Sequence, residues 1–406
     1  MKTVLAIVDG LGGRPTDYNG KTCLEAAKTP NIDELAKRGS TGLLDPIKPG
    51  VKPESDTAHL SIFGYDLDKW YTGRGVFEAL GIGMKVKRGD VCFRTNFATV
   101  DENLNVQDRR AGRIQEGQKG LEGALQDLKS SQPDVKVIFK ASVEHRGALI
   151  LRGPGLSGQI TDIDPHETGV KVGKAEPLAD EESAKETAKI VNEIVQQSHE
   201  ILSGLSLNID RRKEGKLPAN ILLFRGASEK IGIPSVRERY GVNGVVIAAG
   251  ALYIGVGRAL GLEFKQAEGV TGRADSPIID KAKLAVKELR DDDTGFAFIH
   301  MKGADSCGHD QDAEAKIAYI EKADEVVGYL LDNLDWNQTR IAFTGDHTTP
   351  IAVGDHTSDP VPIVFAGQDI TPDEVGEFNE KTVRKGSVGR ISGQVVPILL
   401  GCSDKI

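Results

Sequence analysis

The chain has 406 residues, 39% of them hydrophobic, so it is long enough for two domains and apolar enough to bury a sizeable core. Its formal net charge of -9, from 51 basic and 60 acidic residues, argues against a nucleic-acid-binding surface over the whole molecule. Four scattered cysteines without a C-x-x-C pair, a short N-terminal apolar run and the absence of a membrane-length apolar stretch favour a cytoplasmic protein with neither a membrane nor a nucleic-acid partner.

Short apolar runs alternate with helical patterns along the chain, which is typical of an α/β fold. We expect strands at residues 3–8, 296–300, 340–344 and 361–366. Each of these runs stands next to, or close to, a polar residue that could bind a ligand. A helix is expected over residues 57–63, with Ser55 or Asp56 near its cap. A longer helix is predicted over residues 180–203, because apolar residues recur there on one face behind an acidic start.

Two candidate site residues lie near the N-terminus. Asp9 directly follows the first apolar run, and ligands of open α/β sheets bind beyond the carboxyl ends of the strands. Ser55 precedes the expected helix, where backbone N–H groups and the helix dipole stabilise a phosphoryl group. Taken alone, Asp9-Gly10 is typical of a turn and Ser55 of an ordinary N-cap.

Carboxylates and histidines gather in the last third of the chain. Asp346 and His347 are adjacent after one apolar run, Asp305 and His309 follow another, and His356 comes soon after. A single histidine would be interpreted as a core or surface residue. Together, these carboxylates and imidazoles indicate a site for a divalent cation such as Zn²⁺, Mn²⁺ or Fe²⁺.

A serine beside metal ligands predicts phosphoryl transfer. A serine hydroxyl is a poor nucleophile at neutral pH, and metal coordination can activate it as an alkoxide. Two ions about 3.5–4 Å apart would clamp the attacking and leaving oxygens of an in-line displacement. The candidate carboxylates and imidazoles, together with Ser55, supply enough ligands for such a pair.

The middle of the chain carries cationic and polar clusters that suit an anionic substrate. Guanidinium groups bind carboxylate and phosphate oxygens in pairs, although spacing alone favours a solvated basic helix face for the arginines of DRRAGR. A lysine near Asp305 could neutralise a transferring phosphoryl group, with a surface lysine as an equal alternative. The candidate substrate-binding residues are Arg109, Arg110, Arg113, His145, Arg146, Asp164, His166, Arg225 and Lys302.

Motifs along nearly the whole chain resemble those of a known family. In order, they are VDGLGGRP, ESDTAHLSIFGYD, YTGRGVFEALGIG, DVCFRTNFATVD, DRRAGRI, HRGALIL, ITDIDPHETG, ILLFRGAS, HMKGADSCGHDQDAEAK, FTGDHTTP and GDHTSDPVPIVF. The sequence is similar to the archaeal-type 2,3-bisphosphoglycerate-independent phosphoglycerate mutases of the alkaline phosphatase superfamily. The last three stretches and Ser55 are specific to the superfamily, and the middle ones point to this branch.

The resemblance implies an α/β fold with an alkaline-phosphatase-like core, a mostly parallel sheet flanked by helices, into which a second α/β domain is inserted. An insertion also follows if the ligands share one site, because Asp9 and Ser55 precede the middle third and the others follow it. We expect the metal-binding core to comprise residues 1–82 and 268–406. The inserted substrate-binding and phosphotransfer domain would comprise residues 83–267.

The resemblance also implies a reaction, the interconversion of 3-phosphoglycerate and 2-phosphoglycerate with Ser55 as the phosphoserine nucleophile. Two divalent ions, Mn²⁺, Zn²⁺ or Co²⁺, would be needed and 2,3-bisphosphoglycerate would not. A carboxylate such as Asp108 or Asp164 could relay protons to the 2- and 3-hydroxyl groups, and Asp108 is preferred. The implied ligands are Asp9, Ser55, Asp346 and His347 for one metal, and Asp305, His309 and His356 for the other.

Other functions are also compatible with the residues. A sulfatase is disfavoured, because the residues after Ser55 do not follow the C/S-x-P-x-R pattern. A metal-dependent phosphatase, or a phosphotransferase such as a homoserine-kinase-like enzyme, would carry the same site motifs. A non-catalytic metal-binding protein is the alternative of a different class. The expected partner is a small molecule, phosphoglycerate, and the oligomeric state stays open, a homo-oligomer included.

Overall fold

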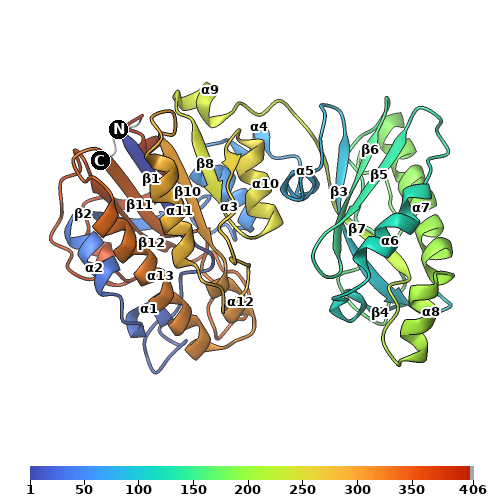
Figure 1. The fold of residues 1–406 in the computed structure, drawn as a ribbon, viewed down its shortest axis with the longest axis horizontal. Helices are drawn as coiled ribbons and strands as arrows, with labels where there is room; N and C mark the ends of the chain where they lie inside the picture. Colours follow the sequence, from blue (N-terminus) through green and yellow to red (C-terminus); the bar gives the residue numbers. More distant parts are fainter. Residues whose placement is uncertain (403–406) are drawn as a thin grey trace. The chain divides into compact units, whose positions relative to one another are not determined.

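The computed structural model describes residues 1–402, which form two compact units (Figure 1). The first unit is discontinuous and consists of Met1–Tyr71 and Ile233–Ile406, and the second is the intervening Thr72–Gly232. Both breaks lie earlier in the chain than those expected near residues 83 and 268. The second break differs most from its expected position, because residues 233–267 contribute two strands to the sheet of the first unit.

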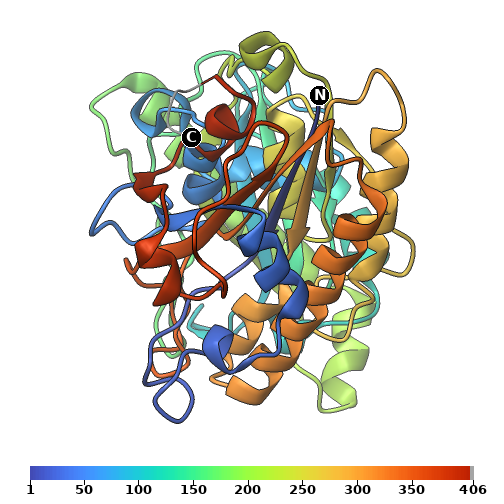
Figure 2. The same ribbon diagram turned by 90° about the vertical axis from the view of Figure 1, so that its left-hand side faces the viewer.

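An eight-stranded sheet forms the centre of the first unit, in the order β13-β2-β12-β11-β1-β10-β8-β9. Strand β12 runs antiparallel to its neighbours β11 and β2, and every other described pair of this sheet is parallel. The four predicted strands are all present, and Figure 2 shows β1 in dark blue in the middle of the unit. The strands are β1 (Lys2–Val8), β2 (Gly39–Asp45), β8 (Gly244–Ile247), β9 (Glu263–Phe264), β10 (Phe296–Met301), β11 (Thr339–Gly345), β12 (Val361–Gly367) and β13 (Gly389–Ser392).

Helices cover both faces of this sheet, as expected for buried parallel strands. Val4, Ala6 and Val8 of β1 share one apolar core with helices α2, α11 and α13. On the opposite face, Phe63 at the end of α3 packs edge-on against Phe298 of β10, with ring centroids 5.3 Å apart. The helices of the unit are α1 (Cys23–Ala26), α2 (Pro30–Lys37), α3 (Ser55–Ile62), α4 (Leu67–Trp70), α9 (Val236–Tyr240), α10 (Ala251–Ala259), α11 (Ile279–Leu289), α12 (Gly303–His309), α13 (Ala313–Asn333), η3 (Thr382–Lys385) and α14 (Val395–Leu399).

The second unit is built on a five-stranded antiparallel sheet in which β3 pairs with β4, β6 and β7, and β6 also pairs with β5. Phe93 and Phe97 of β3 face the apolar stripe of α7, the long helix predicted from its periodicity. Cys92 packs on the other face with Val76 of α5. The elements are α5 (Gly75–Gly81), β3 (Val91–Val100), β4 (Val106–Asp108), η1 (Ala111–Arg113), α6 (Gln118–Ala124), η2 (Leu125–Asp127), β5 (Lys136–Ala141), β6 (Arg146–Arg152), α7 (Glu182–Ser203), α8 (Ser206–Lys213) and β7 (Ile221–Glu229).

The predicted fold class is therefore confirmed, with a largely parallel, helix-flanked sheet and a second unit inserted into it. Among residues 1–402, no helix combines the length and the apolar character needed to cross a bilayer.

Candidate active site

Three neighbouring central strands of the larger sheet bring the candidate metal ligands together at their carboxyl ends. Strands β10, β1 and β11 are parallel, and Val8 of β1 lies level with Met301 on one side and Gly345 on the other. The carboxyl ends of all three strands therefore meet, which is where α/β sheets bind ligands. The residues that follow these ends are Asp9, Lys302, Asp305, Asp346 and His347.

Asp9, Asp346 and His347 form a first buried group, with Ser55 beside it. The Nε2 atom of His347 lies 3.1 Å from Asp9 Oδ1 and 3.5 Å from Asp346 Oδ2. The same nitrogen is 3.5 Å from Ser55 Oγ. Ser55 is the first residue of α3 and Glu54 is its N-cap, so the helix begins slightly earlier than expected. The structure thus brings together four residues that the motifs assign to one metal.

Asp305, His309 and His356 form a second group next to the first. Asp305 Oδ1 lies 3.2 Å from His309 Nε2 and 3.3 Å from His356 Nε2. Asp305 and His309 are one turn apart on α12, so their side chains share a helix face. The rings of His347 and His356 stack with centroids 3.6 Å apart, which joins the two groups.

The hydrogen bonds around His347 leave a lone pair directed at the carboxylates. Thr349 Oγ1 donates to Asp305 Oδ1, so it can only accept from His347 Nδ1, 3.0 Å away. The proton of His347 is then on Nδ1, and Nε2 presents a lone pair to Asp9 and Asp346. Lone pairs of one nitrogen and two carboxylate oxygens converge, and a cation between them would make this arrangement favourable.

The two carboxylates of the first group are buried close together, which disfavours their charged forms unless a cation is bound beside them. Burial and the neighbouring Asp9 raise the pKa of Asp346 well above its ordinary value. Burial opposes ionisation of Asp9 as well, but Lys302, His347 and His300 together outweigh it and lower the pKa of Asp9. Asp9 Oδ1 and Asp346 Oδ2 are buried and accept no hydrogen bond from the described residues. A divalent cation would satisfy both oxygens, so the residues fit a metal site.

Lys302 bridges the two ligand groups. Its ammonium group lies 3.2 Å from Asp9 Oδ2 and 3.1 Å from Asp305 Oδ2. The sequence suggested this lysine for neutralising a phosphoryl group, and the structure places it between two metal-ligand candidates.

Three further buried residues lie at this site and were not predicted from the sequence. His59 lies one helical turn after Ser55, and its Nδ1 is 2.6 Å from the carbonyl oxygen of Ser55. The ring of His300 stacks on Tyr253, with centroids 3.5 Å apart. Burial lowers the pKa of His59 to about 4 and that of His300 well below its ordinary value, so both rings are neutral. The helical spacing from Ser55 could have identified His59, whereas Tyr253 lies in an apolar stretch without any such signal.

Behind the site, a buried lysine connects the loops that follow β1 and β11. Lys316 of α13 is fully buried, and its ammonium donates to the carbonyl oxygens of Gly12 at 2.9 Å and Thr349 at 2.8 Å. Burial lowers the pKa of this lysine. The loops that carry Asp9 and His347 are therefore held by one side chain.

We expect Lys316→Met to lower the free energy of unfolding by about 1–3 kcal/mol, because two carbonyl oxygens would lose their partner in a dry interior. Urea unfolding of the two proteins measures the difference. Lys322→Met on the same helix is the control, since Lys322 holds a single, partly buried carbonyl and should cost less. Equal stability of the Lys316 variant and the wild type would contradict this role.

In the second unit, Arg109 is paired with a carboxylate of the protein itself. Its Nε and Nη2 atoms donate to the two oxygens of Asp164 at 2.8 Å each, and Nη2 also lies 3.3 Å from His166 Nδ1. Asp108 Oδ1 accepts the backbone N–H of Arg110 at 2.6 Å and so stabilises the turn that follows β4. These contacts order the predicted DRRAGR segment.

A second cluster of unpartnered polar atoms lies on the sheet of this unit. Arg94 of β3 and Arg225 of β7 are cross-strand partners, and the Nε atoms of both are buried without a hydrogen bond among the described residues. Arg94 Nη1 lies 3.2 Å from Glu78 Oε1. Burial lowers the pKa of Arg94 to about 9, and Glu78 opposes this shift. Arg225 was predicted from the sequence and Arg94 was not, although an arginine within an apolar strand is itself a signal.

His145 is surrounded by positive charge. Burial, followed by Arg146, Arg110 and other arginines, lowers the pKa of His145 to about 3, so the ring is neutral. Its Nδ1 atom is buried and makes no hydrogen bond among residues 1–402, and Glu144 Oε2 lies 3.8 Å from it. A cluster of arginines with free donor atoms suits an anion that carries several oxygens.

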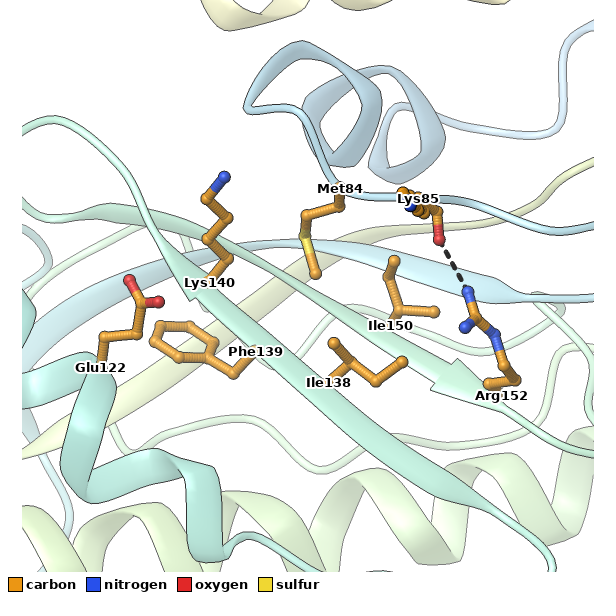
Figure 3. A pocket seen from close by; sticks show the side chains of 8 residues that line it. All are labelled: Met84, Lys85, Glu122, Ile138, Phe139, Lys140, Ile150 and Arg152. Carbon is orange, nitrogen blue, oxygen red and sulfur yellow. Dashed lines mark hydrogen bonds between the residues drawn. The ribbon is translucent and has the colours of Figure 1, made fainter.

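A cavity of about 260 Å³ beside β5 and β6 contains none of the predicted site residues (Figure 3). Arg152 donates to the carbonyl oxygen of Lys85 at 2.7 Å and also pairs with Asp90. Lys140 donates to the carbonyl oxygen of Ile82. Because these cations already have partners in the protein, the cavity is a poorer anion site than the Arg94 cluster.

Comparisons with known proteins match both parts of the chain. Residues 36–208 match the profile of the 2,3-bisphosphoglycerate-independent phosphoglycerate mutase family, and residues 228–394 match that of type I phosphodiesterases and nucleotide pyrophosphatases. The mutase of that name from Ignicoccus hospitalis is 46% identical over 100% of this chain and 98% of its own. One from Methanocaldococcus jannaschii is 45% identical, with the same coverage.

Two solved structures are also similar to this chain. A protein from Pyrococcus horikoshii superposes with a TM-score of 0.84 at 38% identity, over 100% of this chain and 98% of its own. The cofactor-independent phosphoglycerate mutase of Thermoplasma acidophilum has a TM-score of 0.71 at 33% identity, over 99% of this chain and 100% of its own. The chain therefore belongs to the family of 2,3-bisphosphoglycerate-independent phosphoglycerate mutases, as its motifs predicted.

Proposed function

We propose that the protein interconverts 3-phosphoglycerate and 2-phosphoglycerate through a phosphoserine at Ser55, with two divalent cations and without 2,3-bisphosphoglycerate. The observation that supports this most strongly is the place of the Ser55 hydroxyl. It stands at the N-terminus of α3 and 3.5 Å from His347 Nε2, beside two buried carboxylate oxygens that accept no hydrogen bond from the described residues. The names of the full-length relatives support the same reaction.

Each of the two ligand groups would hold one cation. Cations held there would neutralise phosphoryl oxygens and lower the pKa of the serine hydroxyl. Their identity would be Mn²⁺, Zn²⁺ or Co²⁺, all of which accept imidazole and carboxylate ligands. We assign Asp9, Ser55, Asp346 and His347 to one cation and Asp305, His309 and His356 to the other.

The reaction then consists of two transfers at one serine. Ser55 Oγ forms a bond to the phosphorus of 3-phosphoglycerate as the bond to the substrate oxygen breaks, and the serine proton ends on that oxygen. Bound glycerate reorients, and its 2-hydroxyl forms the new bond to phosphorus while the bond to Ser55 breaks. The proton of that hydroxyl returns to the serine, so the cycle is balanced. The N-terminus of α3 stabilises the phosphoserine anion.

We assign recognition of the glycerate carboxylate and phosphate to the second unit. Its arginines present planar donors, two of which have unpartnered Nε atoms, and neutral His145 adds a hydrogen-bonding group without repelling them. Asp108 stays the candidate for relaying protons, because it lies on the turn that also carries Arg110. The proposed binding residues are Arg94, Arg110, Arg113, His145, Arg146 and Arg225, with Arg109, Asp164 and His166 ordering the segments around them.

We expect Arg94→Gln to raise the KM for 3-phosphoglycerate about 10-fold or more, because it removes a charge-assisted hydrogen bond worth about 1.5–3 kcal/mol. Steady-state kinetics in both directions measures the change. Arg152→Gln is the matched control on the same sheet and should leave KM unaltered, since Nε and Nη2 of Arg152 both donate to Asp90, whereas Nε of Arg94 has no acceptor among the described residues. An unchanged KM in the Arg94 variant would remove Arg94 from the binding set.

Phosphorus NMR of the protein with Mn²⁺ and 3-phosphoglycerate, without 2,3-bisphosphoglycerate or ATP, tests the proposed function. Growth of a 2-phosphoglycerate signal to a stable ratio with little inorganic phosphate is the expected result. Inorganic phosphate alone would identify a phosphatase. An unchanged spectrum would point to another substrate, and ATP with homoserine would be tested next.

A further inference from the structure

Tyr253 is held rigidly at the centre of the candidate active site. It lies near the start of α10, directly after β8, and is only 3% exposed. Its ring stacks on the imidazole of His300 with centroids 3.5 Å and planes 17° apart. His300 belongs to β10, a central strand of the sheet. The ring stack therefore fixes the direction in which the phenol hydroxyl points.

The hydroxyl of Tyr253 contacts three groups of the site. It donates to Asp9 Oδ2 at 2.5 Å and accepts from Lys302 Nζ at 3.2 Å. Its oxygen is also 3.5 Å from Ser55 Oγ. A phenol has one proton, and here that proton goes to Asp9. Toward Ser55 the tyrosine therefore presents a lone pair, to which the serine hydroxyl can donate.

These contacts set the orientation of both Asp9 and Ser55. Tyr253 and Lys302 share Oδ2 of Asp9, which leaves Oδ1 unpartnered on the side of His347. If the serine proton points to Tyr253, the lone pairs of Ser55 Oγ turn toward the same side. The carboxylate and the nucleophile are then both directed at the place where the cation ligands converge.

We propose that Tyr253 is a positioning residue of the phosphoryl-transfer site. Its hydroxyl holds Asp9 with Oδ1 toward the bound cation and orients Ser55 Oγ for attack on phosphorus. The part that concerns Ser55 rests on the proposed function, whereas the part that concerns Asp9 depends only on cation binding.

Tyr253→Phe separates the hydroxyl from the ring, because phenylalanine keeps the stack on His300. We expect Mn²⁺ to bind this variant about 10–100-fold more weakly, as is usual when a group that orients a metal ligand is removed. We also expect kcat to fall by a similar factor with little change in KM, because the substrate-binding residues are untouched. Isothermal titration with Mn²⁺ and steady-state kinetics with 3-phosphoglycerate measure the two effects.

Tyr65→Phe is the matched control. Tyr65 is 2% exposed, and its hydroxyl donates to the carbonyl oxygen of Pro234, away from the ligand groups. This variant loses one buried hydrogen bond, so its melting temperature should fall while Mn²⁺ affinity and kcat stay as in the wild type. A purely structural role for Tyr253 predicts the same pattern in the Tyr253 variant.

The outcomes distinguish this proposal from the proposed function. Wild-type Mn²⁺ affinity and wild-type kcat in Tyr253→Phe would overturn the proposal and leave the mutase assignment intact. A wild-type protein without mutase activity would overturn the assignment, and the Mn²⁺ titrations would still decide whether Tyr253 positions Asp9. Loss of affinity in Tyr253→Phe alone, with normal affinity in Tyr65→Phe, would support the proposal.

Discussion

Ser55→Ala is expected to abolish the interconversion of 3-phosphoglycerate and 2-phosphoglycerate, with a loss in kcat of about 10⁴-fold or more. The reaction as proposed stores the phosphoryl group on this one oxygen while glycerate reorients, and no other hydroxyl among the described residues contacts His347 Nε2. The rate is measured by phosphorus NMR. Mass spectrometry of protein quenched during turnover should show phosphoserine in the wild type and none in the variant.

Ser61→Ala is the control for this experiment, because Ser61 lies on the same helix and near its other end. It should retain both activity and the phosphoserine. Substantial turnover in Ser55→Ala would mean that the phosphoryl group is transferred to a different acceptor or directly between substrate oxygens.

Removing divalent cations should have an effect of comparable size. We expect a chelator to abolish activity and Mn²⁺ or Co²⁺ to restore it, because Asp9 and Asp346 are both fully buried beside His347. Lys302 supplies one positive charge, which Asp9 shares with Asp305, so it does not replace the cations. The melting temperature should fall along with the activity, since binding energy of the cations stabilises the folded state. Elemental analysis and thermal denaturation before and after chelation provide the measurements.

Counting the cations bound by two variants tests which residues are the ligands. Asp305→Asn should lose the cation of the second group and retain the other, whereas Asp280→Asn should retain both, since Asp280 pairs with Lys283 at the start of α11. Full activity in metal-free protein would contradict the two-metal reaction.

Much of this site could be predicted from the sequence because its signals are local. Asp9 and Asp346 each directly follow a short apolar run, and such a run followed by a carboxylate indicates a strand end. Asp305 and His309 are four residues apart, which places them on one helix face whatever the rest of the fold. Parallel neighbours β1, β10 and β11 then bring these local features together.

The remaining features depend on pairings between distant segments. Arg94 meets Arg225 only through the register of β3 and β7, and a single sequence does not determine that register. Tyr253 reaches Asp9 from a helix that follows β8, whose place beside β10 was not predicted. Because strand β8 was not predicted, the second domain boundary was expected too late in the chain.

The discontinuity of the first unit has a consequence for the growing chain on the ribosome. β1 is synthesised first, but its partners β10 and β11 are synthesised after the whole second unit has emerged. The second unit has its own sheet and core, so it can fold before the strands that pair with β1 have been synthesised. A nascent chain that stops before β10 and β11 therefore lacks Asp346 and His347, and its apolar strand β1 is unpaired and available for aggregation until both partners have been made.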